Sequence, residues 1–194
     1  MKKIGLTGGI GSGKSIICNI LKIMGYPVFN SDDQAKLLMT TNNAVIQQIK
    51  NLFGEEAYIE DTLNRPYLAS KVFYDEKLKL ALNKIVHPAV RAAFDEWAIL
   101  QKKPLVFNEA AILYETGAYK TFDYTVLVAA PEEIRIARVT SRDKTTIEEV
   151  EQRMKNQWKD EVKIEMASYV INNDDTTLVT PKVIAMLKYF ESAI

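Results

Sequence analysis

The sequence predicts an α/β fold in which helices cover both faces of a mostly parallel β-sheet. Short apolar segments rich in β-branched and aromatic residues alternate with longer segments of helical periodicity. A glycine-rich loop joins the first apolar segment to the first helical one. In addition, the roughly 75 residues between Phe29 and Leu105 hold helical patterns and no convincing strand. This stretch is too long for a simple crossover, so we expect a helical subdomain inserted after the second strand.

Five segments are expected to be strands because they are short and apolar, as strands buried on both faces of a sheet are. They are Lys3–Thr7, Pro27–Phe29, Leu105–Asn108, Tyr124–Ala129 and Tyr169–Ile171.

Helical patterns fill most of the remaining chain. The inserted block holds Asp32–Thr40, Ala44–Phe53, Arg65–Phe73, Glu76–Val86 and Pro88–Leu100. Pro88 suits the first position of a helix, where its missing N–H leaves no hydrogen bond unmade. A further helical stretch, Glu132–Ala167, has an expected break at residues 143–146, and an amphipathic helix, Pro181–Ala193, closes the chain.

The glycine-rich loop has the pattern that binds the phosphates of a nucleoside triphosphate. It consists of Gly8, Gly9, Ile10, Gly11, Ser12, Gly13, Lys14 and Ser15. The glycines let backbone N–H groups curl around phosphate oxygens, Lys14 can reach the β- and γ-phosphates, and the Ser15 hydroxyl can ligate Mg²⁺. Because a strand precedes the loop and a helix follows it, the helix dipole would point at the anion.

Composition places the chain among ordinary globular proteins of one domain. Its 194 residues are 47% hydrophobic, and 25 basic residues balance 25 acidic ones, so no overall basic field favours a nucleic-acid partner. The single cysteine, Cys18, excludes an intramolecular disulfide and is expected to be a small buried residue. No apolar run reaches the ~18 residues of a membrane span, and we expect a cytoplasmic protein without a signal peptide. The oligomeric state stays open.

Carboxylates follow two predicted strands, at the edge of a parallel sheet where ligands bind. Asp32 comes just after the second strand and could accept the proton of an attacking hydroxyl. An equally good alternative is that Ser31 and Gln34 form a capping box and Asp32 only favours the helix dipole. Glu109 ends the third strand, where it could support Mg²⁺ directly or through water. Glu115 is a second candidate, and each of the two could instead be a surface carboxylate.

Two arginines in the helical stretch 132–167 could contact a phosphoryl group. Arg138 and Arg142 are four residues apart and so share one face of a helix. Guanidinium groups are always ionised and suit phosphate oxygens, and a helical lid carrying them could close over a nucleotide. The alternative is a solvated helix face, which we favour for Arg135 and Arg153.

The inserted block offers weaker signals. His87, the only histidine, precedes Pro88, which favours extended backbone at the preceding residue. A turn or helix entry is therefore expected for His87 rather than general base catalysis. Lys36, Arg65 and Arg91 could contact an anionic substrate, although each alone is expected to be a surface charge.

Taken in order, these segments resemble one family, dephospho-CoA kinase, across nearly the whole chain. Residues 4–15 are similar to the opening of that family, and residues 28–36 to its Val-Ile-Asp-Ala-Asp signature, with Asp32 at the second acid. His87 and Pro88 match its His-Pro pair, and residues 112–115 resemble its Leu-Leu-Phe-Glu run. Later landmarks of the family fall on Arg138, Arg142, Gln157 and Asn173.

The resemblance implies a P-loop kinase-type three-layer fold with a five-stranded parallel sheet, an inserted helical substrate subdomain and a helical lid. The expected core comprises residues 1–30, 104–131 and 168–194, with the insertion at 31–103 and the lid at 132–167. The implied reaction is phosphoryl transfer from ATP, with Mg²⁺, to the ribose 3′-hydroxyl of dephospho-CoA, the last step of CoA synthesis.

Roles carry over from the family position by position. Asp32 would be the base or would orient the hydroxyl, while Lys14 and the loop amides would stabilise the transferring phosphoryl group. The resemblance implies that Arg138, Arg142 and Asn173 bind the nucleotide, that Ser15 holds Mg²⁺, and that Arg65 and His87 lie on the acceptor side. We also expect Glu109 to support the metal, and Lys36 and Glu115 to bind the substrate.

Four positions depart from the family pattern. Ile16, beside the phosphates, replaces the usual threonine, and the other departures are Asn30, Ala111 and Ser168. Two other functions are compatible with the loop alone: a small P-loop kinase acting on a nucleoside monophosphate or small metabolite, and a nucleotide-binding regulatory module. Turnover with different acceptors would separate the three.

Overall fold

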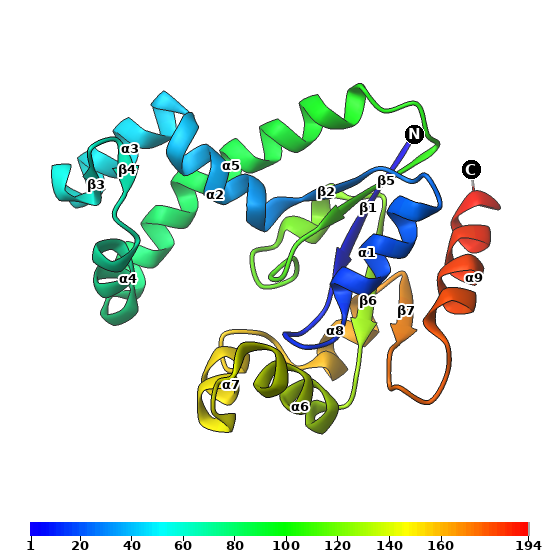
Figure 1. Cartoon of the computed structure of the whole chain (residues 1–194). Helices are drawn as coiled ribbons and strands as arrows, with labels where there is room; N and C mark the ends of the chain where they lie inside the picture. Colours follow the sequence, from blue (N-terminus) through cyan, green and yellow to red (C-terminus); the bar gives the residue numbers. More distant parts are fainter. Residues whose placement is uncertain (194) are drawn as a thin grey trace. The chain divides into compact units, whose positions relative to one another are not determined.

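One five-stranded parallel sheet organises the core of the molecule, shown in Figure 1 as a computed structural model that describes residues 1–193. Its strands lie in the order β2-β5-β1-β6-β7. Their bounds are β1 (Lys2–Thr7), β2 (Val28–Asn30), β5 (Leu105–Glu109), β6 (Tyr124–Ala129) and β7 (Tyr169–Asn172). The predicted α/β class and all five predicted strands are therefore confirmed, with ends that differ by at most one residue.

Strand β1 lies at the centre of the sheet, between β5 and β6. After β1, the next strands of the sheet along the chain, β2 and β5, lie on one side of β1, and the last two, β6 and β7, lie on its other side. The strand order therefore switches beside β1. In open parallel sheets, ligands bind beyond the carboxyl ends of the strands at such a switch point.

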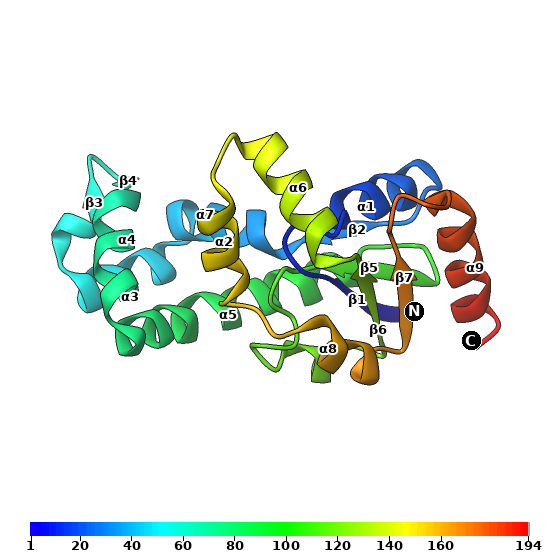
Figure 2. The ribbon, with the colours of Figure 1, turned by 90° about the horizontal axis from the view of Figure 1, so that it is seen from below.

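Helices pack the apolar faces of the sheet into a core. Helix α1 (Lys14–Ile23) buries Ile17, Cys18 and Leu21, and helix α9 (Val179–Glu191) packs beside it. Both helices share one cluster with residues of β1, β5 and β6. Burial of each large side chain in that cluster contributes ~1.5–3 kcal/mol. In Figure 2, α1 and α8 lie on opposite sides of the sheet, which gives the three layers.

Three helices occupy the stretch between β6 and β7, namely α6 (Glu132–Asp143), α7 (Ile147–Met154) and α8 (Asp160–Met166). The expected break at residues 143–146 is confirmed. Lys144 ends α6 with a φ of 51°, and Thr146 caps α7 in a capping box with Glu149. A second interruption at residues 155–159 was not predicted and proves to be important for the site.

Residues 31–100 form a second compact unit with a core of its own. It contains α2 (Ser31–Thr41), α3 (Asn43–Phe53), α4 (Arg65–Tyr74) and α5 (Glu76–Ile99), and a 3₁₀ turn at Glu55–Ala57. Asn42, Asn64 and Asp75 cap three of these helices through their side chains. The boundaries predicted for core, insertion and lid stay predictions, and residue 194 lies outside the described residues.

The expectation that the inserted block has no strand is wrong. A two-stranded antiparallel hairpin, β3 (Tyr58–Ile59) and β4 (Thr62–Leu63), lies between α3 and α4. Its turn places Glu60 and Asp61 in the left-handed region, with φ of 46° and 63°. The usual signal for such a turn is Asn-Gly or Asp-Gly, which is missing here, and the strands are too short to show alternation.

The predicted helix boundary at Pro88 is also wrong, because α5 runs through it as one helix of 24 residues. Pro88 lacks the N–H that would bond to the preceding turn, and this loss normally kinks or ends a helix. The buried residues Val86, Val90 and Phe94 nevertheless follow one another at four-residue spacing across it. The continuous apolar stripe explains why packing outweighs the local preference of proline.

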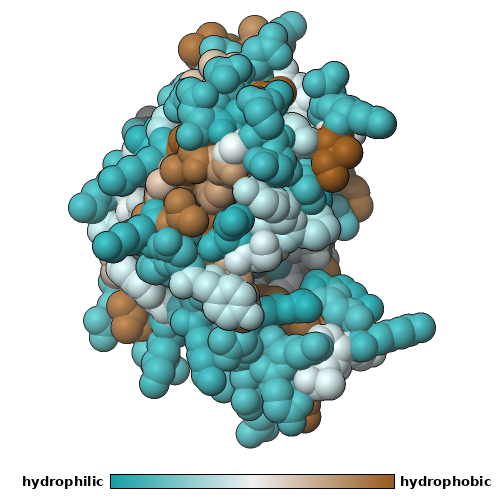
Figure 3. Space-filling view, turned by 90° about the vertical axis from the view of Figure 1, so that its left-hand side faces the viewer, coloured by the Kyte–Doolittle hydropathy of each residue, from teal (hydrophilic) through white to brown (hydrophobic). Residues whose placement is uncertain are grey.

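Exposed apolar residues do not form one extended surface in the view of Figure 3, where they lie in small groups among hydrophilic ones. The helical unit contributes several exposed large hydrophobic residues, among them Leu37, Ile59, Phe73, Tyr74 and Leu80. Scattered residues of this kind are normal on globular proteins. Among residues 1–193, no helix combines the length and apolar character needed to cross a membrane.

Candidate active site

The phosphate-binding loop connects the carboxyl end of β1 to the first residue of α1, as predicted. Gly13 precedes the helix with a φ of 91°, a left-handed conformation that favours glycine. Helix α1 begins at Lys14, so its first backbone N–H groups and the positive end of its dipole belong to the loop. The local geometry therefore suits an anion at the switch point of the sheet.

Side chains at the start of α1 have the chemistry that a triphosphate requires. The Lys14 ammonium donates to the Gly8 carbonyl, with Nζ 2.8 Å from the oxygen, so it already lies back over the loop. Ser15 follows in the first helical turn and is exposed. Ile16 is 51% exposed and has no polar atom in its side chain, so it can offer a phosphate only its backbone N–H.

Helix α6 packs directly against the loop. A side chain at Gly9 would place its Cβ 1.8 Å from Nη1 of Arg135, which leaves room for glycine alone. Arg135 is only 8% exposed and forms an ion pair with Asp160, with Nη1 3.2 Å from Oδ2. Burial raises the pKa of Asp160, and the nearby charge of Arg135 opposes that shift. The preference for a solvated Arg135 is thus wrong, since it is buried beside the loop.

Arg138 and Asn173, which were predicted to bind the nucleotide, also lie against the loop. Nη1 of Arg138 donates to the Gly11 carbonyl at 3.2 Å, and its Nη2 donates to the Asn173 carbonyl at 3.0 Å. The side chain of Asn173 in turn donates to the Ser12 carbonyl at 2.8 Å. The bonds to Gly11 and Ser12 satisfy loop carbonyls, while backbone N–H groups at the start of α1 are the groups suited to binding an anion.

Arg142 is not brought to the loop. It is exposed near the end of α6 and pairs with Asp143, with Nε 2.7 Å from Oδ1. The same carboxylate pairs with Arg153 at 3.0 Å. The hydrogen bond from Arg142 holds the pKa of Asp143 below its ordinary value. Arg138 and Arg142 therefore have different surroundings, although they are one turn apart.

Glu115, predicted on the acceptor side, is held by the protein itself. Its Oε1 lies 2.8 Å from Nζ of Lys163, which is fully buried, and accepts from the Trp158 N–H at 2.8 Å. A lysine is rarely buried unless it is paired. This pairing was missed because Lys163 lies 48 positions away and reads locally as a surface charge on α8.

Glu109 ends β5 beside β1 and β2, at the carboxyl edge of the sheet. Its Oε2 accepts from Nδ2 of Asn30 at 2.8 Å. Cys18 is buried, as predicted, and burial followed by the charge of Glu109 raises the pKa of its thiol to about 12, while Lys14 opposes the shift. The charges of Glu109 and Lys14 are therefore both close enough to Cys18 in α1 to influence its pKa.

The oxygen donors present fit Mg²⁺ better than other metals. The Ser15 hydroxyl and the Glu109 carboxylate are hard oxygen ligands, which Mg²⁺ prefers. Within residues 1–193 no group of three or more His, Cys, Asp or Glu side chains could hold a metal. Mg²⁺ usually takes one or two protein ligands together with waters and substrate phosphates, so such a sparse set suits it.

In the helical unit, Asp32 and His87 lie close enough to interact electrostatically. Asp32 stands in the first turn of α2, which packs along α5. Burial lowers the pKa of His87, the charge of Arg91 lowers it further, and the charge of Asp32 opposes both. The expectation of a turn or helix entry at His87 is wrong, because the residue sits inside α5.

The other two candidates of this unit lie elsewhere in it. Lys36 is exposed and pairs with Asp33, with Nζ 2.8 Å from Oδ1. Arg65 is the exposed first residue of α4, which Figure 1 shows at the opposite end of the unit from the start of α2. The unit therefore gathers Asp32, His87 and Arg91, and leaves Lys36 and Arg65 outside this group.

Comparison with known proteins decides the family. The model of the dephospho-CoA kinase family matches residues 2–178 of the chain. The chain belongs to the dephospho-CoA kinase family. Curated dephospho-CoA kinases from Bacteroides fragilis and Salinibacter ruber are 36% and 44% identical to it, over 99% and 91% of this chain and 94% and 90% of theirs. The crystal structure of TT1252 from Thermus thermophilus is 36% identical, with a TM-score of 0.86 over 100% of this chain and 97% of that one.

Two departures from the dephospho-CoA kinase pattern have local explanations. Asn30 stands where the family signature has its first acid, and its amide bonds Glu109, whereas a second carboxylate there would face a like charge. Ser168 replaces a usual aspartate, and its Oγ accepts from the Thr125 N–H at 3.0 Å. A hydroxyl thus satisfies the backbone N–H in place of a carboxylate.

Proposed function

We propose that this protein transfers the γ-phosphoryl group of ATP to the 3′-hydroxyl of the ribose in dephospho-CoA, which gives CoA and ADP. The reaction is the last step of CoA biosynthesis, and the enzyme is a phosphotransferase with an alcohol acceptor. The observation that carries the proposal is the phosphate loop at the switch point of the sheet, in a chain that matches the dephospho-CoA kinase family over residues 2–178.

The reaction requires one bond to form and one to break at phosphorus. The ribose oxygen bonds to the γ-phosphorus, the bond to the oxygen that bridges the β- and γ-phosphates breaks, and ADP leaves with that electron pair. The charge on the transferring group is spread over its equatorial oxygens. Lys14 and the N–H groups at the start of α1 would stabilise this charge, because they are fixed before the reaction begins.

Mg²⁺ would be held by Ser15 and Glu109, the latter directly or through water. When bound, it would neutralise charge on the β- and γ-phosphate oxygens. Arg138 and Asn173 would fix the loop on the nucleotide side. Arg142 would reach the donor phosphates from the lid, where its pair with Asp143 would have to be exchanged for a phosphate.

The helical unit would supply the acceptor side. Asp32 would take the hydroxyl proton or orient the hydroxyl, and both roles need a carboxylate that is ionised at neutral pH. His87 lies within electrostatic reach of both Asp32 and Arg91. Lys36 and Arg65 would contact the anionic phosphates of dephospho-CoA.

The decisive experiment offers the enzyme a panel of acceptors. ADP release is measured with ATP and Mg²⁺ and with dephospho-CoA, AMP, CMP or shikimate. We expect turnover that depends on dephospho-CoA. Turnover only with a monophosphate or with shikimate would instead identify another small P-loop kinase. ATP binding without acceptor-dependent turnover would identify a regulatory module. The cytoplasmic location and the absence of a nucleic-acid partner stay predictions.

A further inference from the structure

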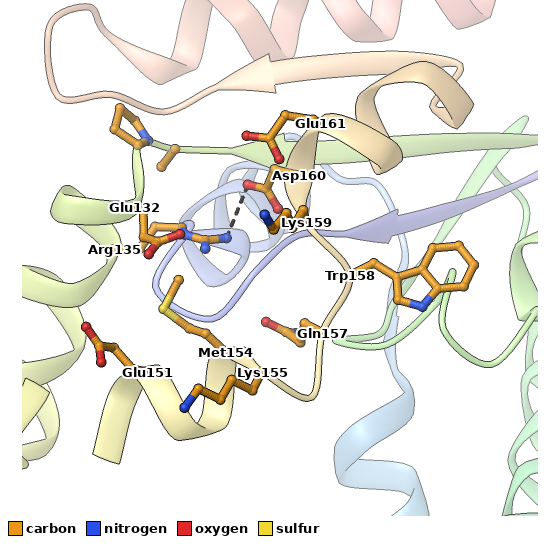
Figure 4. Close-up of a pocket in the computed structure, with 12 residues that line it drawn as sticks. Glu132, Arg135, Glu151, Met154, Lys155, Gln157, Trp158, Lys159, Asp160 and Glu161 are labelled. Carbon is orange, nitrogen blue, oxygen red and sulfur yellow. Dashed lines mark hydrogen bonds and ion pairs between the residues drawn. The ribbon is translucent and has the colours of Figure 1, made fainter. Parts of the chain in front are cut away.

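The segment between α7 and α8, residues 155–159, crosses beside the phosphate loop. Gln157, in the middle of this segment, is half-buried, and its side chain forms two hydrogen bonds to other parts of the chain. Its Oε1 accepts from the Ile10 N–H at 2.8 Å, and its Nε2 donates to the Ala111 carbonyl at 3.0 Å. Figure 4 shows this segment passing the loop, with Gln157 beside the cavity. The amide group thus bridges the loop and the chain that follows β5.

The backbone that follows Gln157 is held at two points. On the next residue, the Trp158 N–H donates to Glu115, which also pairs with the buried Lys163. Two residues further on, Asp160 pairs with Arg135, whose guanidinium lies against Gly9. Gln157 therefore acts from a fixed support, and its side chain needs little ordering to keep its place.

The Ile10 amide is the part of the loop that this support controls. Four of the six residues from Gly8 to Gly13 are glycines, so the loop has unusual backbone freedom when nothing holds it. The bond to Gln157 fixes the direction of the peptide between Gly9 and Ile10. It also occupies the Ile10 N–H, so the phosphate contact predicted at Ile10 stays a prediction that would require this bond to be exchanged. The cradle is thereby left to the later N–H groups of the loop.

A cavity of about 600 Å³ adjoins this support and is lined by α6, α7 and residues 157–161. Nε of Arg135 and Oδ1 of Asp160 are buried at its wall and have no hydrogen-bond partner in the part of the chain that the structure describes. The wall is thus polar and tightly arranged where it meets Gly9. Replacement of Gln157 by a side chain that cannot form hydrogen bonds would remove both of its bonds and loosen the loop at Ile10.

We propose that Gln157 is a positioning residue for phosphoryl transfer, which acts by fixing the Ile10 peptide and, through it, the place of the γ-phosphate. This inference rests on the proposed function. It does not require Gln157 to touch a substrate. Since transfer demands alignment of the reacting atoms, a displacement of about 1 Å can lower the rate by ~10²-fold with little effect on binding.

The test compares two variants at position 157 with a matched control. Gln157→Met keeps the length of the side chain and removes both bonds. Gln157→Glu keeps an acceptor for the Ile10 N–H and loses the donor to Ala111. Asn156→Ala is the control, because it removes a neighbouring side-chain amide that bonds only within its own segment, to Gln152. The measurements are kcat, both KM values, and hydrogen exchange of the Ile10 amide without ligands.

We expect kcat of Gln157→Met to fall ~10- to 100-fold while both KM values change less than about threefold. Its Ile10 amide should exchange faster, Gln157→Glu should keep most of the protection and an intermediate kcat, and Asn156→Ala should match the wild type. Unchanged kcat in Gln157→Met would overturn the proposal, as would faster exchange without a loss of kcat. If Gln157→Met fails to fold, Gln157→Glu decides, since wild-type kcat together with lost Ile10 protection would also contradict it.

Failure of this inference is distinguishable from failure of the proposed function. If the wild type turns over no dephospho-CoA, the proposed function is wrong. The exchange of the Ile10 amide and the rate with whichever acceptor is used then still test Gln157 on their own.

Discussion

The phosphate loop and the helical unit of residues 31–100 hold their candidate residues in contrasting ways. Around the loop, the side chains of Arg138 in α6, Asn173 just after β7 and Gln157 bond to its backbone, so several partners set its shape. In the helical unit, the candidates stand on helices, and the charges of Asp32 and Arg91 act on the partly buried His87. In the proposed reaction, the loop would form the donor half, fixed by backbone geometry, and the helical unit would supply an acceptor half whose residues act as individual charges.

The largest expected effect is on the donor half. Lys14→Ala should lower kcat by about 10³-fold or more, because it removes a fixed charge that stabilises the transition state. The melting temperature should change little, since the Lys14 side chain is only partly buried. Lys22→Ala, a basic residue in the last turn of the same helix, is the control and should keep full activity. Near wild-type turnover of Lys14→Ala would show that Lys14 does not stabilise the transition state and would contradict the role proposed for the loop.

On the acceptor half, Asp32→Asn should lower kcat by ~10²-fold or more if Asp32 takes the hydroxyl proton. The substitution keeps the shape and removes the charge. Asp33→Asn is the matched control, because its side chain is exposed and pairs with Lys36. Steady-state kinetics decide the matter, and a full kcat for Asp32→Asn would leave Asp32 a helix-dipole residue, as the capping alternative holds.

The support of the loop should depend on Glu115 for stability rather than for substrate binding. Glu115→Gln would leave the fully buried Lys163 without its ion pair, and breaking a buried pair costs about 3–5 kcal/mol. Urea unfolding measures this free energy. Glu76→Gln, which breaks an exposed pair with Lys79, should change it little. If Glu115→Gln is as stable as the wild type but has a raised KM for dephospho-CoA, Glu115 binds the substrate and this prediction is wrong.

The smallest expected effect is the pH dependence from His87 in the helical unit. Its pKa is lowered below the ordinary value of 6.5, mainly by burial, so the unfolded state binds the proton more tightly. Stability from this group is therefore complete above pH 6.5 and is lost as the pH falls toward and through the folded pKa. The free energy of unfolding of the wild type should decrease in that window, and His87→Gln should remove this part of the slope. An identical slope in both proteins would show that His87 titrates normally.

The same contrast explains what could be predicted from the sequence. The strands, the loop and the helix after it have short-range signals, namely apolar runs and fixed glycine spacing, and all five strands were predicted to within one residue. Arg138 and Asn173 were predicted as nucleotide-side residues from the family resemblance, and both lie against the loop. Their direct contact with the nucleotide stays a prediction.

What the sequence could not provide depends on contacts between distant segments. Arg135 reads as a surface residue of α6, and only the fold brings it to Gly9 and Asp160. Lys163 reads as a surface residue of α8, and the fold buries it beside Glu115. The helix through Pro88 was missed for a related reason, since packing of its apolar stripe outweighs the local preference of proline.

In the proposed reaction, ATP bound at the phosphate loop donates its γ-phosphoryl group to the ribose 3′-hydroxyl of dephospho-CoA. The most direct measurement incubates the enzyme with dephospho-CoA, Mg²⁺ and ATP labelled in the γ-phosphate, and then locates the label in the products by mass spectrometry and ³¹P NMR. We predict one labelled phosphate on the 3′-oxygen for each ADP released, and none of it in Lys14→Ala. Label found only in inorganic phosphate, or on another acceptor, would contradict the claim.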